Sequence, residues 1–365
     1  MCSTVFCTLD PRHLHSLLTV DALPPKGNYE LAVPVSVLCW EHFSLPPGLP
    51  SIHSVEVWVD DSPTATFRPR LLALLKEQER VQLTLRVGGD KEKTVEAELA
   101  PLLESLVHLA AEPNIHRINC IASNCKLSCS SLSLEQKRGG DEAKIALKGF
   151  GPGCSFSSVD DASKLGTGIS RFLPAKETSD SHGSSSSLRA IFKEVSLSCV
   201  VAMLSQWKGS RLKVLWVEGS AESATQSSPT ALKDSNGNTD SCICFARTLA
   251  QFPLTDLNLS ANGMTVEGLL ECFNSLRSKR TLFCIKIRKE PAMKHPEVLN
   301  GLLQCLSTLS LCILKLSDNS FTESQVTQVL QATAKMEQLL LLHIKDGNAF
   351  TTEHEALLED RMFVE

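Results

Sequence analysis

The sequence is poor in aromatic residues and lacks the motifs of common nucleotide-binding and hydrolytic enzymes. It contains a single tyrosine, and aromatic residues make up 5% of its 365 positions. It has no GxxxxGK[ST] phosphate loop, no GxSxG nucleophile elbow and no GxGxxG loop. The glycine-rich stretch 149–153 includes Pro152 and is predicted to be a turn. These absences disfavour nucleotide hydrolysis, acyl transfer and base stacking on single-stranded nucleic acid.

Features of secretion and membrane insertion are also lacking. Residues 1–15 show no basic segment followed by an apolar one, as a secretory signal would. No apolar run approaches the ~18 residues of a membrane-spanning helix. With 42% hydrophobic residues, 21% charged residues and a net charge of −5, the chain is predicted to be folded and soluble. We expect it to be nuclear or cytoplasmic, not secreted, and to have no membrane partner.

Many of the 14 cysteines lie inside an apolar pattern. Cys272, Cys284, Cys305 and Cys312 occupy such positions, where cysteine acts as a small hydrophobic residue. Together with the missing secretory signal, this placement predicts reduced thiols instead of disulfides.

Another group of cysteines is the candidate for metal or catalytic chemistry. Cys120, Cys125 and Cys129 lie close together in the sequence, and His116 is nearby. The group lacks the paired CxxC spacing of structural zinc sites. We therefore expect no cofactor, no bound metal and no enzymatic activity. The alternative of a different class is an enzyme or zinc-binding protein that uses this region.

Four segments share one apolar register at near-constant spacing. They are Leu254-x-x-Leu257-x-Leu259, Leu282-x-x-Ile285-x-Ile287, Leu311-x-x-Leu314-x-Leu316 and Leu339-x-x-Leu342-x-Ile344. Their starts lie 28, 29 and 28 residues apart, and apolar residues at helical spacing follow at 266–276 and 325–336. A short strand followed by a helix cannot bury its apolar face alone, so stacked neighbours must complete the core. The period predicts an α/β solenoid.

Two of these segments resemble a known repeat family. Residues 254–264 read LTDLNLSANGM and residues 311–321 read LCILKLSDNSF, which resemble the LxxLxLxxNxL pattern of ribonuclease-inhibitor-type leucine-rich repeats. The resemblance implies a horseshoe with parallel strands on its concave face and helices on its convex face. The family's ladder asparagine is matched by Asn262 and Asn319, whereas Glu290 and Gly347 stand at the equivalent places. We expect a ladder that is broken at those two turns.

The repeat pattern weakens toward the N-terminus, which predicts an irregular N-terminal half. The expected regions are an extended or capping region at 1–48, degenerate leucine-rich repeats at 49–135, a mobile low-complexity insertion at 136–187 in which 143–150 is a candidate strand, repeats at 188–350 with an inserted loop at 219–240, and a C-terminal cap at 351–365. Strands are expected at 52–59, 81–87, 115–120, 192–197 and 212–217, and helices at 69–80, 95–111, 200–207 and 352–362. Alternating strands and helices predict a parallel arrangement over most of the chain.

Alternation along each strand identifies the residues that point away from the core. These candidate partner-binding residues are Trp216, Asn258, Lys286, Arg288, Lys315, His343 and Lys345. Like charges opposed across a sheet destabilise it by up to about 1 kcal/mol. A basic band in an acidic protein therefore predicts a concave face that binds an acidic protein surface or peptide. A solvated face without a partner is the other interpretation, and nucleic acid is the weaker acidic partner.

Two families of repeat proteins share features with the C-terminal region. It resembles the end of Tonsoku-like DNA-repair scaffolds, in which a non-repeat insertion precedes a strand like LTDLNLSAN. It also resembles the sensor arrays of NOD-like receptors, which share the 28/29 alternation. The first resemblance implies a nuclear scaffold in replication-associated DNA repair, and the second implies a cytosolic sensing or regulatory module. We predict a noncatalytic protein–protein interaction scaffold; the partner's identity and the oligomeric state are left open.

Overall fold

The structure of the protein is a computed structural model. It describes residues 5–8, 29–34, 52–59, 67–76, 81–87, 115–123, 131–137, 142–148, 159–172, 187–219, 235–357 and 363–364. The chain forms two compact units, residues 1–157 with 167–186 and residues 158–166 with 187–365. Each unit is described by itself.

The first unit begins with parallel strands. They are β1 (Val5–Thr8), β2 (Tyr29–Pro34), β3 (Ile52–Val59), β4 (Val81–Val87) and β5 (Ile115–Ser123), each pairing with the next. Val55 and Val57 are buried at alternate positions of β3, as the pleat of a strand requires. The bounds of β3 and β4 confirm the predicted strands, and helix α3 (Phe67–Lys76) lies close to the expected helix at 69–80. Residues 1–48 contribute two strands to this sheet.

The last two strands of the first unit run antiparallel. β6 (Ser131–Lys137) pairs with β5, and β7 (Glu142–Lys148) pairs with β6. Their connections, residues 124–130 and 138–141, are too short for the crossover that a parallel strand requires. The expected parallel arrangement therefore does not extend to these strands. The helix expected at 95–111 lies outside the described residues.

Helix α5 (Val159–Phe172) lies within the segment expected to be a mobile insertion. Ala162, Gly166 and Ile169 are buried at helical spacing, which shows that serine and glycine elsewhere in the segment concealed an amphipathic pattern. The Gly166 carbonyl accepts a hydrogen bond of 3.0 Å from Nε1 of the buried Trp207. This part of the segment is a packed helix.

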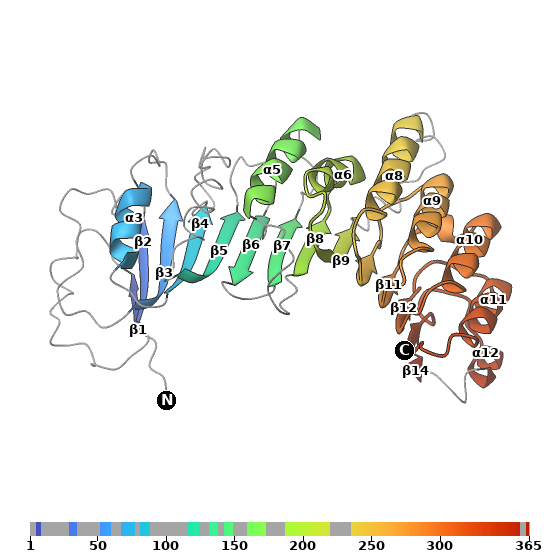
Figure 1. Cartoon of the computed structure of the whole chain (residues 1–365). Coiled ribbons are helices and arrows are strands. Elements are labelled where there is room, and N and C mark those ends of the chain that lie inside the picture. The colour runs from blue at the N-terminus through green and yellow to red at the C-terminus, as the bar shows by residue number, and fades with distance from the viewer. Residues whose placement is uncertain are drawn as a thin grey trace, which may run out of the picture. The chain divides into compact units, whose positions relative to one another are not determined.

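The second unit alternates strands and helices. Its strands are β8 (Ser187–Lys193), β9 (Leu212–Glu218), β10 (Asp256–Asn258), β11 (Cys284–Lys286), β12 (Ile313–Lys315) and β13 (Leu341–His343), all parallel. Its main helices are α6 (Leu197–Ser205), α8 (Ser235–Leu249), α9 (Val266–Leu276), α10 (Pro296–Leu306) and α11 (Glu323–Thr333). These helices lie along one face of the strands in Figure 1. We call the face away from the helices the open face.

Several boundaries of this unit differ from the expected ones; helix α6, for example, covers Leu197–Ser205 instead of 200–207. β8 covers Ser187–Lys193 instead of 192–197, because Leu188, Ala190 and Phe192 are buried at alternate positions and α6 begins directly afterwards. Helix α8 begins within the expected loop 219–240, and its buried residue Phe245 helps to anchor it. The expected helix at 352–362 is shorter: α12 (Thr352–Ala356) is followed by β14 (Phe363–Val364), which pairs with β13.

The core of the second unit is formed by the repeated apolar register. All twelve register residues are buried: Leu254, Leu257, Leu259, Leu282, Ile285, Ile287, Leu311, Leu314, Leu316, Leu339, Leu342 and Ile344. Each helix adds buried residues at helical spacing, as Leu269, Phe273 and Leu276 do in α9. The strand at β9 and the strands of all four repeats confirm the predicted positions. The result is an open α/β arrangement of parallel strands and helices, consistent with a solenoid.

Side-chain hydrogen bonds join the turns that follow neighbouring strands. Asn319 Nδ2 donates to the Ile287 carbonyl at 2.8 Å, and its Oδ1 accepts the Glu290 N–H at 3.0 Å. One repeat later, Asn348 Oδ1 accepts the N–H groups of Asn319 at 3.2 Å and Phe321 at 3.0 Å. The ladder position is therefore Asn348, and Gly347 supplies the left-handed residue before it, with φ of 66°.

Glu290 takes the ladder position of the second repeat. Its carboxylate accepts the N–H groups of Asn262 and, at 3.0 Å, Met264. The side chain is fully buried, and this burial raises its pKa to about 8 even though the backbone N–H groups favour the charged form. The expectation of a ladder broken at Glu290 and Gly347 is wrong, because a carboxylate can accept the same backbone donors as an amide.

Candidate functional site

The predicted strand row exists as one row of register partners on the open face. Trp216, Asn258, Lys286, Lys315 and His343 are paired in this order across strands β9 to β13. The residues that precede them on the strands, such as Ile285 and Leu314, point toward the helices and are buried. The strand pairing thus brings five of the seven candidate residues together.

Lys286 and Lys315 form the electrostatic centre of this row. The two residues are direct register partners, and both are partly buried. Burial lowers the pKa of Lys286, and the nearby Arg288 and Lys315 charges lower it further, while Glu218 and Cys284 oppose this shift. Among the described residues, no salt bridge involves either ammonium group.

Two of the predicted basic residues are already paired within the chain. Arg288 Nη2 lies 2.6 Å from Asp318 Oδ2, and Lys345 Nζ lies 2.8 Å from Glu355 Oε1. The contact with Glu355 raises the pKa of Lys345. The basic band is therefore narrower than the sequence suggested, and its unpaired charge is concentrated at the two lysines of strands β11 and β12.

The remaining candidates differ in their accessibility. Asn258 is only 2% exposed, and its Oδ1 accepts hydrogen bonds from the Ser260 N–H and hydroxyl, so it is not available to a partner. Trp216 is half-buried, with the Arg189 guanidinium carbon 4.7 Å from the centroid of its ring. His343 is also half-buried, and its Nε2 lies 3.3 Å from Asp346 Oδ2.

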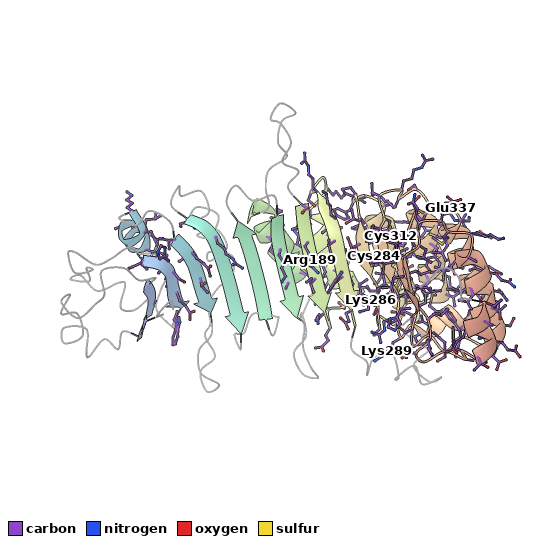
Figure 2. The ribbon with its side chains drawn as sticks, turned by 90° about the horizontal axis from the view of Figure 1, so that it is seen from below. Arg189, Cys284, Lys286, Lys289, Cys312 and Glu337 are labelled. Atoms are coloured by element: carbon purple, nitrogen blue, oxygen red, sulfur yellow. The ribbon has the colours of Figure 1, made fainter. Side chains whose placement is uncertain are left out.

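The register pair Lys286 and Lys315, which we call the lysine row, is bordered by apolar residues that were not predicted from the sequence. Phe283 and Leu340 are 44% and 66% exposed, although both are large and apolar. They occupy the same position in their repeats, directly after the first register leucine. That shared position in the two repeats is the sequence signal for these exposed side chains. Figure 2 labels Cys284 and Lys286, which are two residues apart on β11, and Cys312 of the next repeat.

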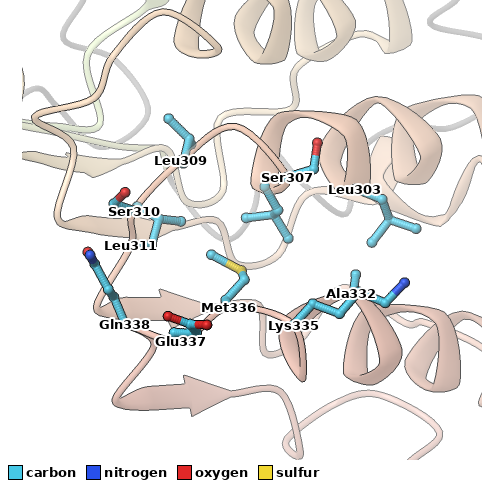
Figure 3. Close-up of a pocket in the computed structure, with 11 residues that line it drawn as sticks. Leu303, Ser307, Leu309, Ser310, Leu311, Ala332, Lys335, Met336, Glu337 and Gln338 are labelled. Atoms are coloured by element: carbon cyan, nitrogen blue, oxygen red, sulfur yellow. The ribbon is translucent and has the colours of Figure 1, made fainter.

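A cavity of about 610 Å³ lies between the C-terminal ends of α10 and α11 (Figure 3). Its walls combine apolar and polar side chains in similar proportion, and the apolar ones include Leu303, Leu306, Leu311 and Met336. The charged groups at its rim are Lys335 and Glu337. Ser307 and Ser310 also line the cavity, and the Ser307 hydroxyl donates a hydrogen bond of 2.8 Å to the Gln304 carbonyl.

The cysteines give no support to a metal or thiolate centre in the described part of the chain. No group of three or more histidine, cysteine or acidic side chains is placed to hold a metal there. Burial, followed by the Asp256 charge, raises the pKa of Cys284 to about 11, so its thiol is neutral at physiological pH. The side chains of Cys120, Cys125 and Cys129 lie outside the described residues, and the zinc hypothesis for them stays untested.

Comparisons with known proteins leave the interpretation to the structure itself. No protein-family model matches this chain, and a search of curated proteins finds no match. None of the described helices is long and apolar enough to cross a membrane.

Proposed function

We propose that this chain is a noncatalytic leucine-rich repeat scaffold that binds an acidic protein partner through its open face. The observation that carries the proposal is the pair of partly buried lysines, Lys286 and Lys315, in direct register on neighbouring strands. In the proposed horseshoe, the open face is the concave face. The repeat assignment is supported by the 28- and 29-residue spacing and by the ladder through Glu290, Asn319 and Asn348.

A carboxylate from a partner would remove an unfavourable feature of this face. Two lysines in register on adjacent strands, whose backbones lie about 4.8 Å apart, repel one another. Partial burial of Lys286 weakens the screening of that repulsion by water. A partner carboxylate between the two groups would form charge-assisted hydrogen bonds with both. Trp216 and His343 flank the same row and extend the surface in both directions.

The family resemblance suggests where such a partner acts. Similarity to Tonsoku-like scaffolds favours a nuclear protein of replication-associated DNA repair, and this is the assignment we propose. Similarity to NOD-like receptors favours a cytosolic sensing or regulatory role as the alternative. Affinity capture from nuclear and cytosolic extracts separates these two proposals, because the captured proteins belong to one compartment or the other.

The decisive experiment compares two double variants with the same change in charge. The test variant is Lys286→Glu with Lys315→Glu, and the control is Lys294→Glu with Lys335→Glu, whose exposed lysines lie outside the strands. We expect proteins captured by the wild type to be lost from the test variant and kept by the control. Circular dichroism should show equal folding of all three. Equal capture by the test variant and the wild type contradicts the proposal.

A further inference from the structure

A continuous apolar surface borders the lysine row on the open face. We call it the apolar edge; it consists of Phe283, Cys284, Cys312, Ile313, Leu340 and Leu341. Cys284, Ile313 and Leu341 are register partners that begin three neighbouring strands, and the other three residues directly precede them. The residues before them are linked by backbone hydrogen bonds, from the Cys312 N–H to the Phe283 carbonyl and from the Leu340 N–H to the Cys312 carbonyl. The six residues are therefore neighbours on three adjacent chain segments.

The exposure of this patch is unusual for large side chains in a folded unit. Leu340 is 66% exposed and Phe283 is 44% exposed, while the register leucines next to them are buried. Contiguous exposed apolar groups with a polar rim are typical of interaction sites. The rim is present here, because Asp256 occupies the next register position on β10 and ends the apolar edge on that side.

The apolar edge and the lysine row are close enough to contact one partner segment. Cys284 and Lys286 are two residues apart on the same face of β11, which corresponds to roughly 7 Å. Along the row, three strands span roughly 10 Å. An α-helix is about 10–12 Å wide, and its turns are about 5.4 Å apart, close to the spacing of the strands.

We propose that the segment bound by the open face is an amphipathic acidic helix that lies across strands β11 to β13. Its apolar side chains, one turn apart, contact the apolar edge, and its carboxylates pair with Lys286 and Lys315. This inference rests on the proposed function and specifies its partner. Charge complementarity chooses the acidic helix: the two ammonium groups have no ion pair within the described residues.

The apolar edge also distinguishes this partner from nucleic acid. Phosphates would neutralise Lys286 and Lys315 but would leave Phe283 and Leu340 in contact with water. A helix with apolar residues at i, i+3 or i+4, and i+7 buries those side chains and gains the associated hydrophobic free energy.

A peptide-display selection tests the inference without a known partner. A library of randomised helical peptides is selected on the full chain and then measured against two variants. The first variant is Phe283→Ser with Leu340→Ser, which changes exposed side chains and leaves the buried register intact. The second is Lys286→Glu with Lys315→Glu. We expect the selected peptides to carry helically spaced apolar residues and acidic residues, and to bind each variant at least about tenfold more weakly, because each variant loses two contacts of an interface centre.

The outcomes separate the inference from the function on which it rests. Loss of binding only in the lysine variant supports an acidic partner and overturns the amphipathic helix. Loss of binding only in the serine variant overturns both the amphipathic acidic helix and the proposed acidic partner. A selection that yields no peptide sensitive to either variant overturns both. Binding of a labelled thymidine oligonucleotide that depends on the lysines and not on the apolar edge assigns the face to nucleic acid and also overturns the inference. Circular dichroism of each variant confirms that the fold is kept.

Discussion

Replacing Glu290 by glutamine should change how the stability of this protein depends on pH. The ordinary pKa of this carboxyl is 4.5, and burial raises it to about 8 in the folded chain. The folded state therefore holds a proton that the unfolded state has already released between these two values. The stability that this proton contributes is complete below about pH 4.5 and is lost as the pH rises through about 8.

The size of the effect follows from the two pKa values. One proton gives a slope of about 1.4 kcal/mol per pH unit, so the free energy of unfolding should fall by roughly 4 to 5 kcal/mol across the interval. The glutamine of the variant has no proton to release. It has one acceptor oxygen for the two N–H groups of Asn262 and Met264, so in acid the variant should be about 1–3 kcal/mol less stable than the wild type. The difference should change sign once the wild type has lost the same amount, roughly between pH 5 and pH 7, and should favour glutamine at every higher pH.

Urea unfolding followed by circular dichroism, at intervals between about pH 5 and pH 9, measures both proteins over the relevant range. The matched control is Glu337→Gln, which removes an exposed carboxylate and should follow the wild-type curve. Cys242 and Cys272 are the titratable groups coupled to Glu290, and burial raises the pKa of both thiols, so they stay neutral over most of this range. A constant difference between Glu290→Gln and the wild type at every pH would refute a raised carboxyl pKa.

Two further predictions concern the turns. Gly347→Ala should lower the midpoint of thermal unfolding more than Gly263→Ala does. Both glycines have positive φ, 66° and 60°, but only at Gly347 would a new Cβ lie 2.6 Å from the Asp318 Cα. Equal shifts would show that the turn relaxes. Asn319→Ala should cost roughly 3 kcal/mol or more, since its buried amide bonds to backbone groups of two repeats. A loss below about 1 kcal/mol in urea unfolding would show that the ladder is not a major source of stability.

The sequence determined the repeated part of the fold through one physical constraint. A strand of this architecture buries alternate side chains against helices, so the spacing of Leu254, Leu282, Leu311 and Leu339 fixes both the strand positions and their register. The same alternation correctly placed Lys286 opposite Lys315. Helix α5 was missed because the serine- and glycine-rich composition of the surrounding segment outweighed the helical spacing of its few buried residues, which makes composition a poor guide to packing.

Contacts between repeats were harder to predict than positions within them. Arg288 and Asp318 are 30 residues apart and occupy different positions of successive repeats, so no single-repeat pattern pairs them. Glu290 was expected to break the ladder because the pattern was compared by residue identity. The turn requires only a side chain that can accept backbone hydrogen bonds, and the carboxylate of Glu290 does so. The position of the exposed Phe283 beside Cys312 likewise depends on the pairing of two repeats and not on the pattern within one.

The open face combines features that do not stabilise the isolated fold. Lys286 and Lys315 repel one another in register, and Leu340 remains exposed although burial of such a side chain contributes about 1.5–3 kcal/mol. On the opposite face, the register leucines are buried against the helices and therefore stabilise the fold. Reversing only Lys286 replaces a repulsive pair by an attractive one, so Lys286→Glu should raise the free energy of unfolding by a few tenths of a kcal/mol while it weakens capture of the partner. A change that stabilises the fold and impairs binding is expected only where the surface is suited to a partner, because a merely solvated face has no binding to lose.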